Sequence, residues 1–165
     1  MRDNVVLIGM MGCGKSTVGK LLAKELGFTF VDTDQYIEEA LGRSIPDIFA
    51  REGEAFFRDQ ELGAAEELAE RQNLVIACGG GLPTRPDSIA SLKYSGTVIF
   101  LHRDPGEIYD SVSMAGRPLG QQGKTAFLER YAAREPIYLQ WADHVVEVAP
   151  VPEETVKKIL EVLER

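Results

Sequence analysis

The chain has 165 residues, 44% of them hydrophobic, and 18 basic against 26 acidic residues give a formal net charge of -8. That length suits a single domain over residues 1–165 with its own core, and the negative balance disfavours a nucleic-acid partner. No apolar run approaches the ~20 residues of a membrane span, the N-terminus runs directly into a strand pattern, and the two cysteines make no disulfide framework. We therefore expect a cytoplasmic protein without a leader peptide or a membrane partner.

The first element carries the strongest motif. A continuous apolar run over 5–8 predicts a buried strand, and apolar residues at helical spacing after Lys15 predict a helix. Between them, Gly9-Met-Met-Gly-Cys-Gly-Lys-Ser-Thr17 has the G-x-x-x-x-G-K-[ST] pattern of a phosphate-binding loop, whose N–H groups and helix N-terminus suit a polyphosphate. An ordinary glycine-rich turn is the alternative, but the Lys-Ser pair and both flanks are in register. The residues expected to contact a nucleoside triphosphate are Gly12, Cys13, Gly14, Lys15, Ser16 and Thr17, with Lys15 on the terminal phosphates and Ser16 on Mg²⁺.

A second strand, predicted over 28–31, runs into two acidic residues, Asp32 and Asp34, before a short helix over 36–41. In a parallel sheet the carboxyl ends of strands carry the chemistry. The two acids are therefore candidates for a metal site and a substrate contact. The alternative is that one of them caps the following helix, which is a common use of Asp at such a junction.

A helical pattern continues over 45–71, with breaks expected near Pro46 and Gly53. Arg58 and Glu61 are three residues apart, so they can pair on one face of this helix. A surface ion pair that contributes little to stability is the default interpretation of the pattern alone.

The strand predicted over 74–78 opens directly into Gly79, Gly80 and Gly81. Three consecutive glycines carry an entropic cost that a simple turn does not require. They are expected where main chain lies against a ligand.

The rest of the chain alternates in the same way. The expected elements are a helix around 89–92, a strand over 97–101, a helix over 104–112, a polar glycine-rich segment over 113–124, a helix over 125–141, a strand over 144–148 and a helix over 152–163. The segment over 113–124 is either a surface loop or a lid that closes over the phosphates with Arg117 at its tip. On the helix that follows, Arg130 and Arg134 lie one turn apart. Five strands alternating with helices predict an α/β fold in three layers, with a parallel sheet covered on both faces.

Phosphate loops occur in kinases, GTPases and ATPases. Two sequence features of these classes are missing from this chain, which narrows the class of protein. The chain has no Asn-Lys-x-Asp segment of the kind with which GTPases read guanine. The strand over 74–78 ends in Cys78-Gly79, without the metal-binding acid of the large ATPases. These features favour a small-molecule kinase of the nucleoside-monophosphate-kinase type.

Within that group the chain resembles the shikimate kinases essentially from end to end. The matching segments are Gly9-x4-Gly14-Lys15-Ser16, Asp32-Thr33-Asp34, Phe57-Arg58-x2-Glu61, Gly79-Gly80-Gly81, Arg117-Pro118-Leu119 and Arg134-x-Pro136-x-Tyr138. The resemblance implies a phosphate-loop kinase fold with a helical acceptor-binding segment near 33–61 and a mobile lid near 113–124. It also implies a monomer that transfers the γ-phosphoryl group of ATP to the 3-hydroxyl of shikimate, a step of chorismate and aromatic amino acid biosynthesis.

The resemblance assigns roles in the acceptor pocket. Arg58 and Arg134 resemble the pair of guanidinium groups that holds the shikimate carboxylate, with Glu61 holding Arg58 in place. Asp34 resembles the carboxylate that accepts hydrogen bonds from the ring hydroxyls, which makes it the candidate general base. The pocket wall is expected to be the backbone of Gly79, Gly80 and Gly81, and its apolar floor Phe49 and Phe57.

The resemblance also assigns roles around the phosphates. Asp32 is expected to hold Mg²⁺ through water, beside the Ser16 hydroxyl. Arg117 resembles the lid arginine that moves onto the transferring phosphate, while Lys15 acts from the other side. Alignment and charge neutralisation by these groups should account for most of the rate.

The sequence departs from the family pattern at two places. Many members have an arginine shortly before the lid that stacks on adenine, and the segment over 110–115 has none. The lid reads Arg117-Pro-Leu-Gly120, where a second leucine is commoner. A kinase for gluconate or another polyhydroxy acid is the alternative acceptor hypothesis, and a nucleotide-binding module that has lost catalysis is the alternative from a different class.

Cys13 carries a separate hypothesis. Loop amides at a helix N-terminus favour the thiolate, so this residue could be reactive. The alternative is a small residue that fits the turn.

Overall fold

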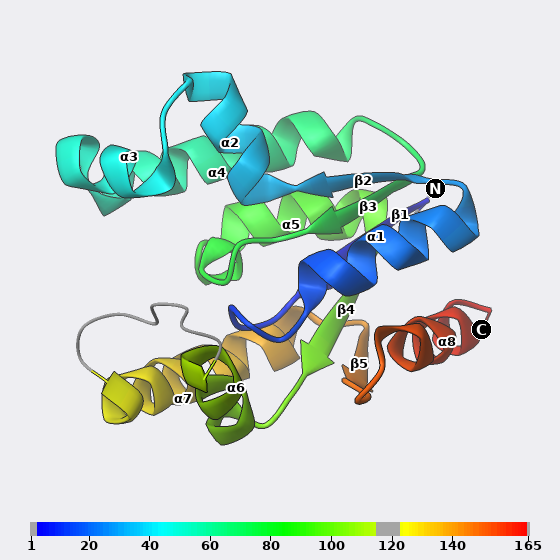
Figure 1. Ribbon diagram of the computed structural model, residues 1–165. Helices are drawn as coiled ribbons and strands as arrows, with labels where there is room; N and C mark the ends of the chain where they lie inside the picture. The colour runs from blue at the N-terminus through cyan, green and yellow to red at the C-terminus, as the bar shows by residue number, and fades with distance from the viewer. Residues whose placement is uncertain (1–2, 115–122, 165) are drawn as a thin grey trace.

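Five short runs of the chain pair side by side into one sheet, and helices connect them (Figure 1). The computed structural model describes residues 3–114 and 123–164. In chain order the elements are β1 (Asn4–Ile8), α1 (Lys15–Leu26), β2 (Thr29–Asp32), α2 (Thr33–Leu41), α3 (Ile45–Glu52), α4 (Glu54–Ala69), β3 (Leu74–Ala77), the 3-10 helix η1 (Leu82–Thr84), α5 (Pro86–Ser95), β4 (Gly96–His102), α6 (Pro105–Met114), α7 (Gly123–Trp141), β5 (His144–Glu147) and α8 (Pro152–Leu163). The predicted alternation of strands and helices is confirmed, with small shifts at most boundaries.

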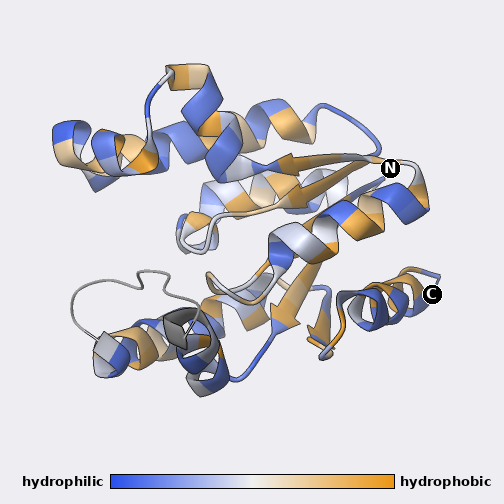
Figure 2. Ribbon diagram, viewed as in Figure 1, coloured by the Kyte–Doolittle hydropathy of each residue, from blue (hydrophilic) through white to orange (hydrophobic). Residues whose placement is uncertain are grey.

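All strands run parallel, in the order β2-β3-β1-β4-β5. α1 packs with α8 over one face of the sheet, while α5 and α7 cover the other and α4 packs against α5. Apolar residues are concentrated on the strands, and polar residues on the outward faces of the helices (Figure 2). β1 and β3 are buried along their whole length, as expected for continuous apolar runs in a sheet covered on both sides. The predicted three-layer α/β/α fold is confirmed.

The strand order places the carboxyl end of β1 at the centre of the sheet edge where ligands of such folds bind. The chain leaves β1 for β2 and β3 on one side and then returns to form β4 on the other, so the order reverses at β1. Ligands of open α/β sheets bind at such a point, outside the carboxyl ends of the strands. The register aligns Leu7 with Ala77 and Asp32 with Ala77. One edge of the sheet therefore brings together the loop after β1, the acids at the end of β2 and the glycines after β3.

α2, α3 and α4 form a lobe that projects from this edge (Figure 1). The lobe has a small apolar core of its own, made of Ile37, Ile48, Phe57 and Ala64. Gly53, with a φ of 86°, separates α3 from α4, which confirms the break predicted there. Pro46 lies in the first turn of α3, after the capping Ser44, so it begins a helix instead of breaking one.

The segment expected to form a lid over 113–124 is only partly described. α6 ends at Met114, and α7 begins at Gly123, two residues before the predicted start. Arg117 lies outside the described residues. Within residues 3–114 and 123–164, no helix combines the length and the apolarity needed to cross a membrane.

Candidate active site

The loop between β1 and α1 is shaped by three glycines. Gly9, Gly12 and Gly14 have φ values of 146°, 87° and 97°, a region that favours glycine. A side chain on Gly9 would also lie 2.8 Å from the carbonyl oxygen of Leu101. The loop can therefore close against β4 and end with Gly14 as the N-cap of α1. The free N–H groups of the first turn of α1 then lie beside the loop, as an anion site requires.

Lys15 is the first residue of α1, and its side chain folds back onto the loop. Its Nζ donates hydrogen bonds to the carbonyl oxygens of Gly9, at 2.7 Å, and Met10, at 3.0 Å. The residue is only 9% exposed. One positive charge is thereby fixed at the site where the sequence predicts phosphates.

Cys13 is enclosed by the same loop. It is 2% exposed, and its Sγ lies 3.8 Å from the Nζ of Lys15. The sulfur is also 3.1 Å from the point where a Cβ on Gly9 would lie. This close packing favours the interpretation of Cys13 as a small residue that fits the turn.

Asp32 combines the two roles that the sequence left as alternatives. Its Oδ1 accepts hydrogen bonds from the backbone N–H groups of Asp34, at 2.9 Å, and Gln35, at 3.2 Å, which caps α2. Its Oδ2 accepts a hydrogen bond of 3.0 Å from the Oγ of Ser16, the residue after Lys15. The capping role is confirmed, and one carboxylate oxygen is directed at the phosphate loop.

The pair formed by Ser16 and Asp32 fits a magnesium ion. Hydroxyl and carboxylate oxygens are the hard ligands that Mg²⁺ prefers, and the ion usually binds through one or two protein groups plus substrate phosphates and water. Within the described part of the chain, no group of three or more His, Cys, Asp or Glu side chains forms a metal site.

Asp34 lies in the first turn of α2, close to Asp32. Burial raises the pKa of its carboxyl above the ordinary value, and the charge of Asp32 raises it further. Lys15 and Arg58 act in the opposite direction, but they do not cancel the shift. Asp34 is therefore a stronger base than an exposed aspartate.

The three glycines after β3 each make room for one functional side chain. A Cβ on Gly79 would lie 2.5 Å from the Oδ1 of Asp34, and a Cβ on Gly80 would lie 3.4 Å from the Nη1 of Arg134. A Cβ on Gly81 would clash with the guanidinium of Arg58. The φ of Gly81 is -94°, so this position needs the space and not an unusual backbone angle. The glycine run brings one carboxylate and two guanidinium groups together over three consecutive residues.

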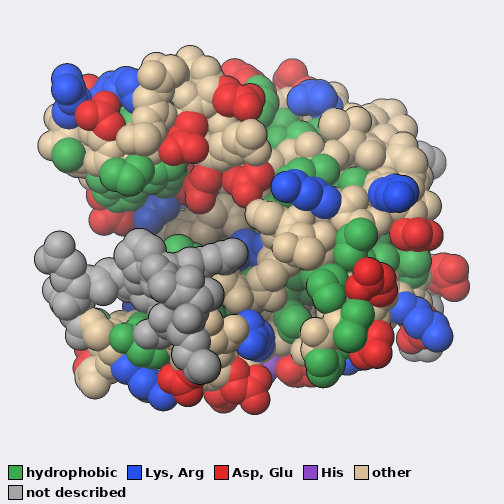
Figure 3. All heavy atoms as spheres, in the orientation of Figure 1, with side chains coloured by type: hydrophobic (Ala, Val, Ile, Leu, Met, Phe, Trp, Pro, Cys, Tyr) green, Lys and Arg blue, Asp and Glu red, His purple; other side chains and the backbone are tan. Residues whose placement is uncertain are grey.

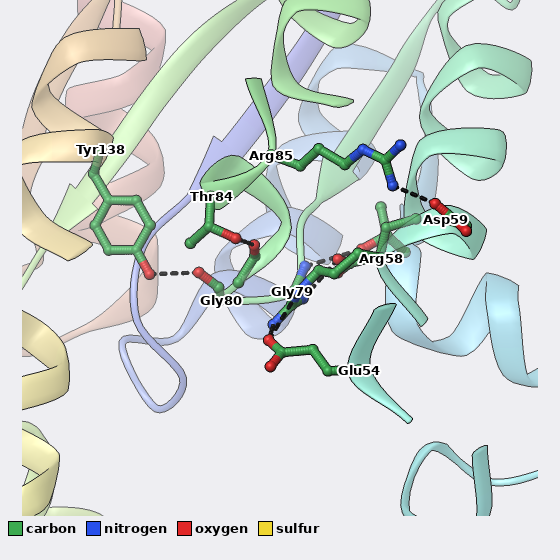
Figure 4. Close-up of polar contacts among 11 residues, drawn as sticks. Glu54, Arg58, Asp59, Gly79, Gly80, Thr84, Arg85 and Tyr138 are labelled. Atoms are coloured by element: carbon green, nitrogen blue, oxygen red, sulfur yellow. Dashed lines mark hydrogen bonds and ion pairs between the residues drawn. The ribbon is translucent and has the colours of Figure 1, made fainter. Parts of the chain in front are cut away.

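Arg58, on α4, is held between two carboxylates (Figure 4). Its Nη1 lies 2.6 Å from the Oε1 of Glu61, and its Nη2 lies 3.0 Å from the Oε2 of Glu54. Glu61 is only 1% exposed. The pairing of Arg58 with Glu61 is confirmed, but it is a buried pair and not the surface pair of the default interpretation. The second partner, Glu54, was not predicted, although its i,i+4 spacing from Arg58 was a usable signal.

Glu61 has an incomplete set of hydrogen bonds. Its Oε1 is bound to Arg58, whereas its buried Oε2 has no partner among the described residues. Burial raises the pKa of Glu61 to about 7, against the lowering effect of Arg58. The charge of the Arg58 cluster therefore changes within the ordinary working range of pH.

Tyr138 fixes the glycine run from the α7 side. Its hydroxyl donates a hydrogen bond of 2.6 Å to the carbonyl oxygen of Gly80 (Figure 4). Its ring packs on Phe100 with centroids 5.1 Å apart. The side chain is fully buried. From the sequence, Tyr138 was noted as part of the segment Arg134-x-Pro136-x-Tyr138, which gives no sign of the role of its hydroxyl.

These side chains meet around a cleft of about 540 Å³. Its lining is made of Met10, Met11, Gly12, Gly14, Lys15, Ser16, Thr17, Asp32, Asp34, Phe49, Ala77, Cys78, Gly79, Gly80, Phe127, Arg130 and Arg134. Figure 3 shows the hollow between the projecting lobe and the opposite part of the molecule, with acidic and basic side chains on its walls. The structure thus brings together most of the predicted site residues, although Gly81 and Arg58 are not among the lining residues.

One expectation about this cleft is corrected. Phe49 lines it and is 37% exposed, as a pocket floor requires. Phe57 is 3% exposed and does not line the cleft, because its ring packs behind Phe49 with centroids 4.9 Å apart. Phe57 therefore supports the floor from the core of the lobe.

A second cavity, of about 490 Å³, lies on the other side of the phosphate loop. Its lining is made of Gly12, Cys13, Gly14, Thr17, Val18, Arg103, Glu107, Ser111, Val148, Ala149, Pro150 and Pro152. Arg103 donates a hydrogen bond of 3.4 Å to the carbonyl oxygen of Gly12. Arg103 was not predicted as a site residue, although a cation two residues after the strand predicted over 97–101 lies at the edge of the sheet where ligands bind.

Comparisons with known proteins agree with this geometry. A family model described as "Shikimate kinase" matches residues 11–164. A shikimate kinase of Clostridium beijerinckii is 38% identical to the chain, over 99% of both sequences. One of Persephonella marina is 39% identical, over 95% of this chain and 96% of that protein.

Solved structures show the same relationship. A shikimate kinase from Acinetobacter baumannii, in complex with shikimate, superposes with a TM-score of 0.90 at 34% identity, covering 99% of this chain and 93% of that one. A gluconokinase from Sinorhizobium meliloti has a TM-score of 0.61 at 20% identity, with 100% and 94% coverage. The second likeness shows a shared fold alone, so the gluconate hypothesis gains no support beyond the fold.

Proposed function

The chain belongs to the shikimate kinase family, and on that premise we propose that its own residues transfer the γ-phosphoryl group of ATP to the 3-hydroxyl of shikimate in the cleft described above. The observation that carries the proposal is the glycine run, which faces one carboxylate at Gly79 and guanidinium groups at Gly80 and Gly81. Shikimate has one carboxylate and three hydroxyls. This arrangement matches such a ligand, with cations for its acidic end and a base for its hydroxyls.

The acceptor is oriented by its two ends. Arg58 and Arg134 bind the carboxylate, because planar guanidinium groups pair well with carboxylate oxygens. Glu61 and Glu54 keep Arg58 in place from behind. Asp34 then accepts a hydrogen bond from the ring hydroxyl that faces the phosphate loop.

Asp34 acts as the general base. As the hydroxyl oxygen attacks the γ-phosphorus, its proton passes to a carboxylate oxygen of Asp34, and the bond from phosphorus to the β–γ bridging oxygen breaks to leave ADP. The raised pKa of Asp34 makes its carboxylate a better proton acceptor than that of an exposed aspartate.

The phosphates are held on the loop by main-chain N–H groups and by Lys15. When bound, Mg²⁺ supplies charge neutralisation and orientation of the phosphate oxygens, with Ser16 and Asp32 as its protein partners. Arg117, outside the described residues, adds a second cation from the lid. Removing Arg117 should lower kcat by roughly 10³-fold or more with little change in acceptor affinity.

The nucleoside end of ATP fits the second cavity. That cavity shares Gly12, Gly14 and Thr17 with the cleft, so a triphosphate on the loop can extend from one to the other. Arg103, Pro150 and Pro152 are all among its lining residues. An arginine in this lining suits a purine base, because a purine stacks well on a guanidinium plane.

The proposed function is tested by ADP release from Mg-ATP with shikimate, with gluconate and with no acceptor. We expect turnover that requires shikimate. Turnover with gluconate instead would retain the phosphate chemistry and overturn the acceptor assignment. Tight ATP binding without turnover on either acceptor would support the non-catalytic alternative.

A further inference from the structure

Arg130 is a cleft-lining residue that the proposed mechanism does not use. It lies on α7 one turn before Arg134, and both side chains line the cleft together with Phe127. Residues three, four and seven apart share one face of a helix, so these three lie along a single stripe of α7. α7 lies opposite the lobe that contains α2 and α3 (Figure 1), and both sides contribute residues to the lining of the cleft.

Among the described residues, none forms a hydrogen bond or an ion pair with the guanidinium of Arg130. Glu135, five residues further along α7, accepts a hydrogen bond of 2.9 Å from the Tyr131 hydroxyl and lies 3.5 Å from His102. No described residue therefore occupies the donors of Arg130, in contrast to those of Arg58, which are bound to two glutamates.

The charges around the acceptor site show why a further cation matters. The formal negative charges are those of Asp32, Asp34, Glu54 and Glu61, and the positive ones are those of Lys15, Arg58 and Arg134. Among these described residues, with every group ionised, the site has an excess of one negative charge without Arg130, and with Arg130 the charges balance. A carboxylate that approaches Arg58 also meets its two glutamates, so the attraction must come mainly from α7. In a protein with a formal charge of -8, this local balance decides whether an anion is attracted.

We propose that Arg130 is a third arginine of the acceptor site, which binds the acceptor carboxylate from the outer side of the cleft together with Arg134. The proposal rests on the proposed function, because it requires an acceptor with a carboxylate. It makes the α7 stripe, and not the Arg58 cluster alone, responsible for selecting acidic acceptors. Arg130 then contributes to acceptor binding and takes no part in the transfer step.

The test compares steady-state kinetics of the full chain with Arg130→Gln, Arg130→Lys and a matched control, Arg71→Gln. Arg71 is an exposed arginine just before β3, at the amino end of the strands and away from the cleft. We expect Arg130→Gln to raise the KM for shikimate about tenfold, as for the loss of one charge-assisted hydrogen bond, with kcat and the KM for ATP within twofold of wild type. Arg130→Lys should recover part of the loss, and Arg71→Gln should match wild type.

An acceptor without a negative charge shows whether Arg130 binds the acceptor carboxylate or the phosphates of ATP. With the methyl ester of shikimate at millimolar concentration, Arg130→Gln and wild type should give kcat/KM values within twofold of each other. An equal loss for acid and ester, a rise in the KM for ATP alone, or no change with shikimate would overturn the proposal. If the wild-type chain turns over shikimate and Arg130→Gln has the same KM for shikimate as the wild type, only the proposal for Arg130 fails. If the wild type does not use shikimate, the proposed function fails with it.

Discussion

At the scale of single residues, the chemistry depends on how burial raises the pKa values of two carboxyl groups, one lining the cleft and one buried next to Arg58. Asp34 and Glu61 both have raised pKa values because both are removed from water. They differ in their partners, because Glu61 is paired with Arg58 whereas Asp34 faces the cleft. One acid is therefore placed to take a proton from a ligand, and the other to adjust the charge of an arginine.

The base assignment predicts the pH dependence of the reaction. Asp34 must be ionised to accept a proton, so kcat/KM for shikimate should rise with pH through its raised pKa, above the ordinary value of 3.8. Asp34→Asn should lower kcat by roughly 10²- to 10⁴-fold and abolish this acid limb. Glu61→Gln is the control, because its acid limb should persist. An acid limb that survives in Asp34→Asn would show that another group is the base.

Glu61 predicts a pH dependence of stability. Its folded pKa of about 7 lies above the model-compound value of 4.5, so its contribution to stability is fully present below about pH 4.5 and is lost as pH rises through 7. Relative to Glu61→Gln, wild type should lose roughly 1–3 kcal/mol of unfolding free energy between pH 5 and pH 8. Urea unfolding of both proteins at the two pH values measures the difference. A difference that does not change with pH would contradict the buried environment of Glu61.

At the scale of elements, the run Gly79–Gly81 is where α2, α4 and α7 each bring a side chain to the end of β3. Gly79→Ala should displace Asp34 and lower kcat, and Gly81→Ala should displace Arg58 and raise the KM for shikimate, each at least tenfold. Gly63→Ala is the matched control, because nothing lies within 4 Å of its added Cβ in the middle of α4. It should keep full activity and gain about 0.5–1 kcal/mol of stability. Full activity of both loop variants would contradict the spatial role of these glycines.

Arg103, in the connection between β4 and α6, is the residue proposed above to bind the adenine base, for which the sequence offered no candidate. Arg103→Ala should raise the KM for ATP several-fold and leave the KM for shikimate unchanged. Ser111 lines the same cavity from α6, so Arg103→Ala combined with Ser111→Arg should recover much of the loss. Binding of inorganic tripolyphosphate, which has no base, should be equal in all three proteins. A loss of tripolyphosphate binding in Arg103→Ala would place this arginine on the phosphates instead.

The helices and strands could be predicted from the sequence better than the contacts between side chains of different elements. The strands and the phosphate loop follow from local patterns, so their places could be predicted. The opposition of Gly79 to Asp34 depends on the packing of α2 against β3, which no local pattern encodes. The resemblance placed Phe57 on the pocket floor, but whether an apolar residue faces a cleft or a core depends on packing that the sequence does not show. Arg103 was missed because it lies in a connection, outside any motif.

At the scale of the whole molecule, an acidic protein binds two acidic substrates. The formal charge of -8 opposes both, so binding depends on cations collected at the edge of the sheet. The strand order explains how they are collected. The loop after β1 supplies Lys15, the connection after β4 supplies Arg103, and the helices that flank this edge supply Arg58, Arg130 and Arg134.

The central claim is that the cleft presents one ring hydroxyl of shikimate to both Asp34 and the phosphate loop. It is tested most directly by nuclear magnetic resonance of the product formed from Mg-ATP and shikimate. Phosphorus–proton coupling identifies the phosphorylated carbon. The account predicts a single product with phosphate on the 3-hydroxyl. Phosphate on another hydroxyl, or a mixture of products, would contradict the orientation set by the carboxylate-binding arginines and Asp34.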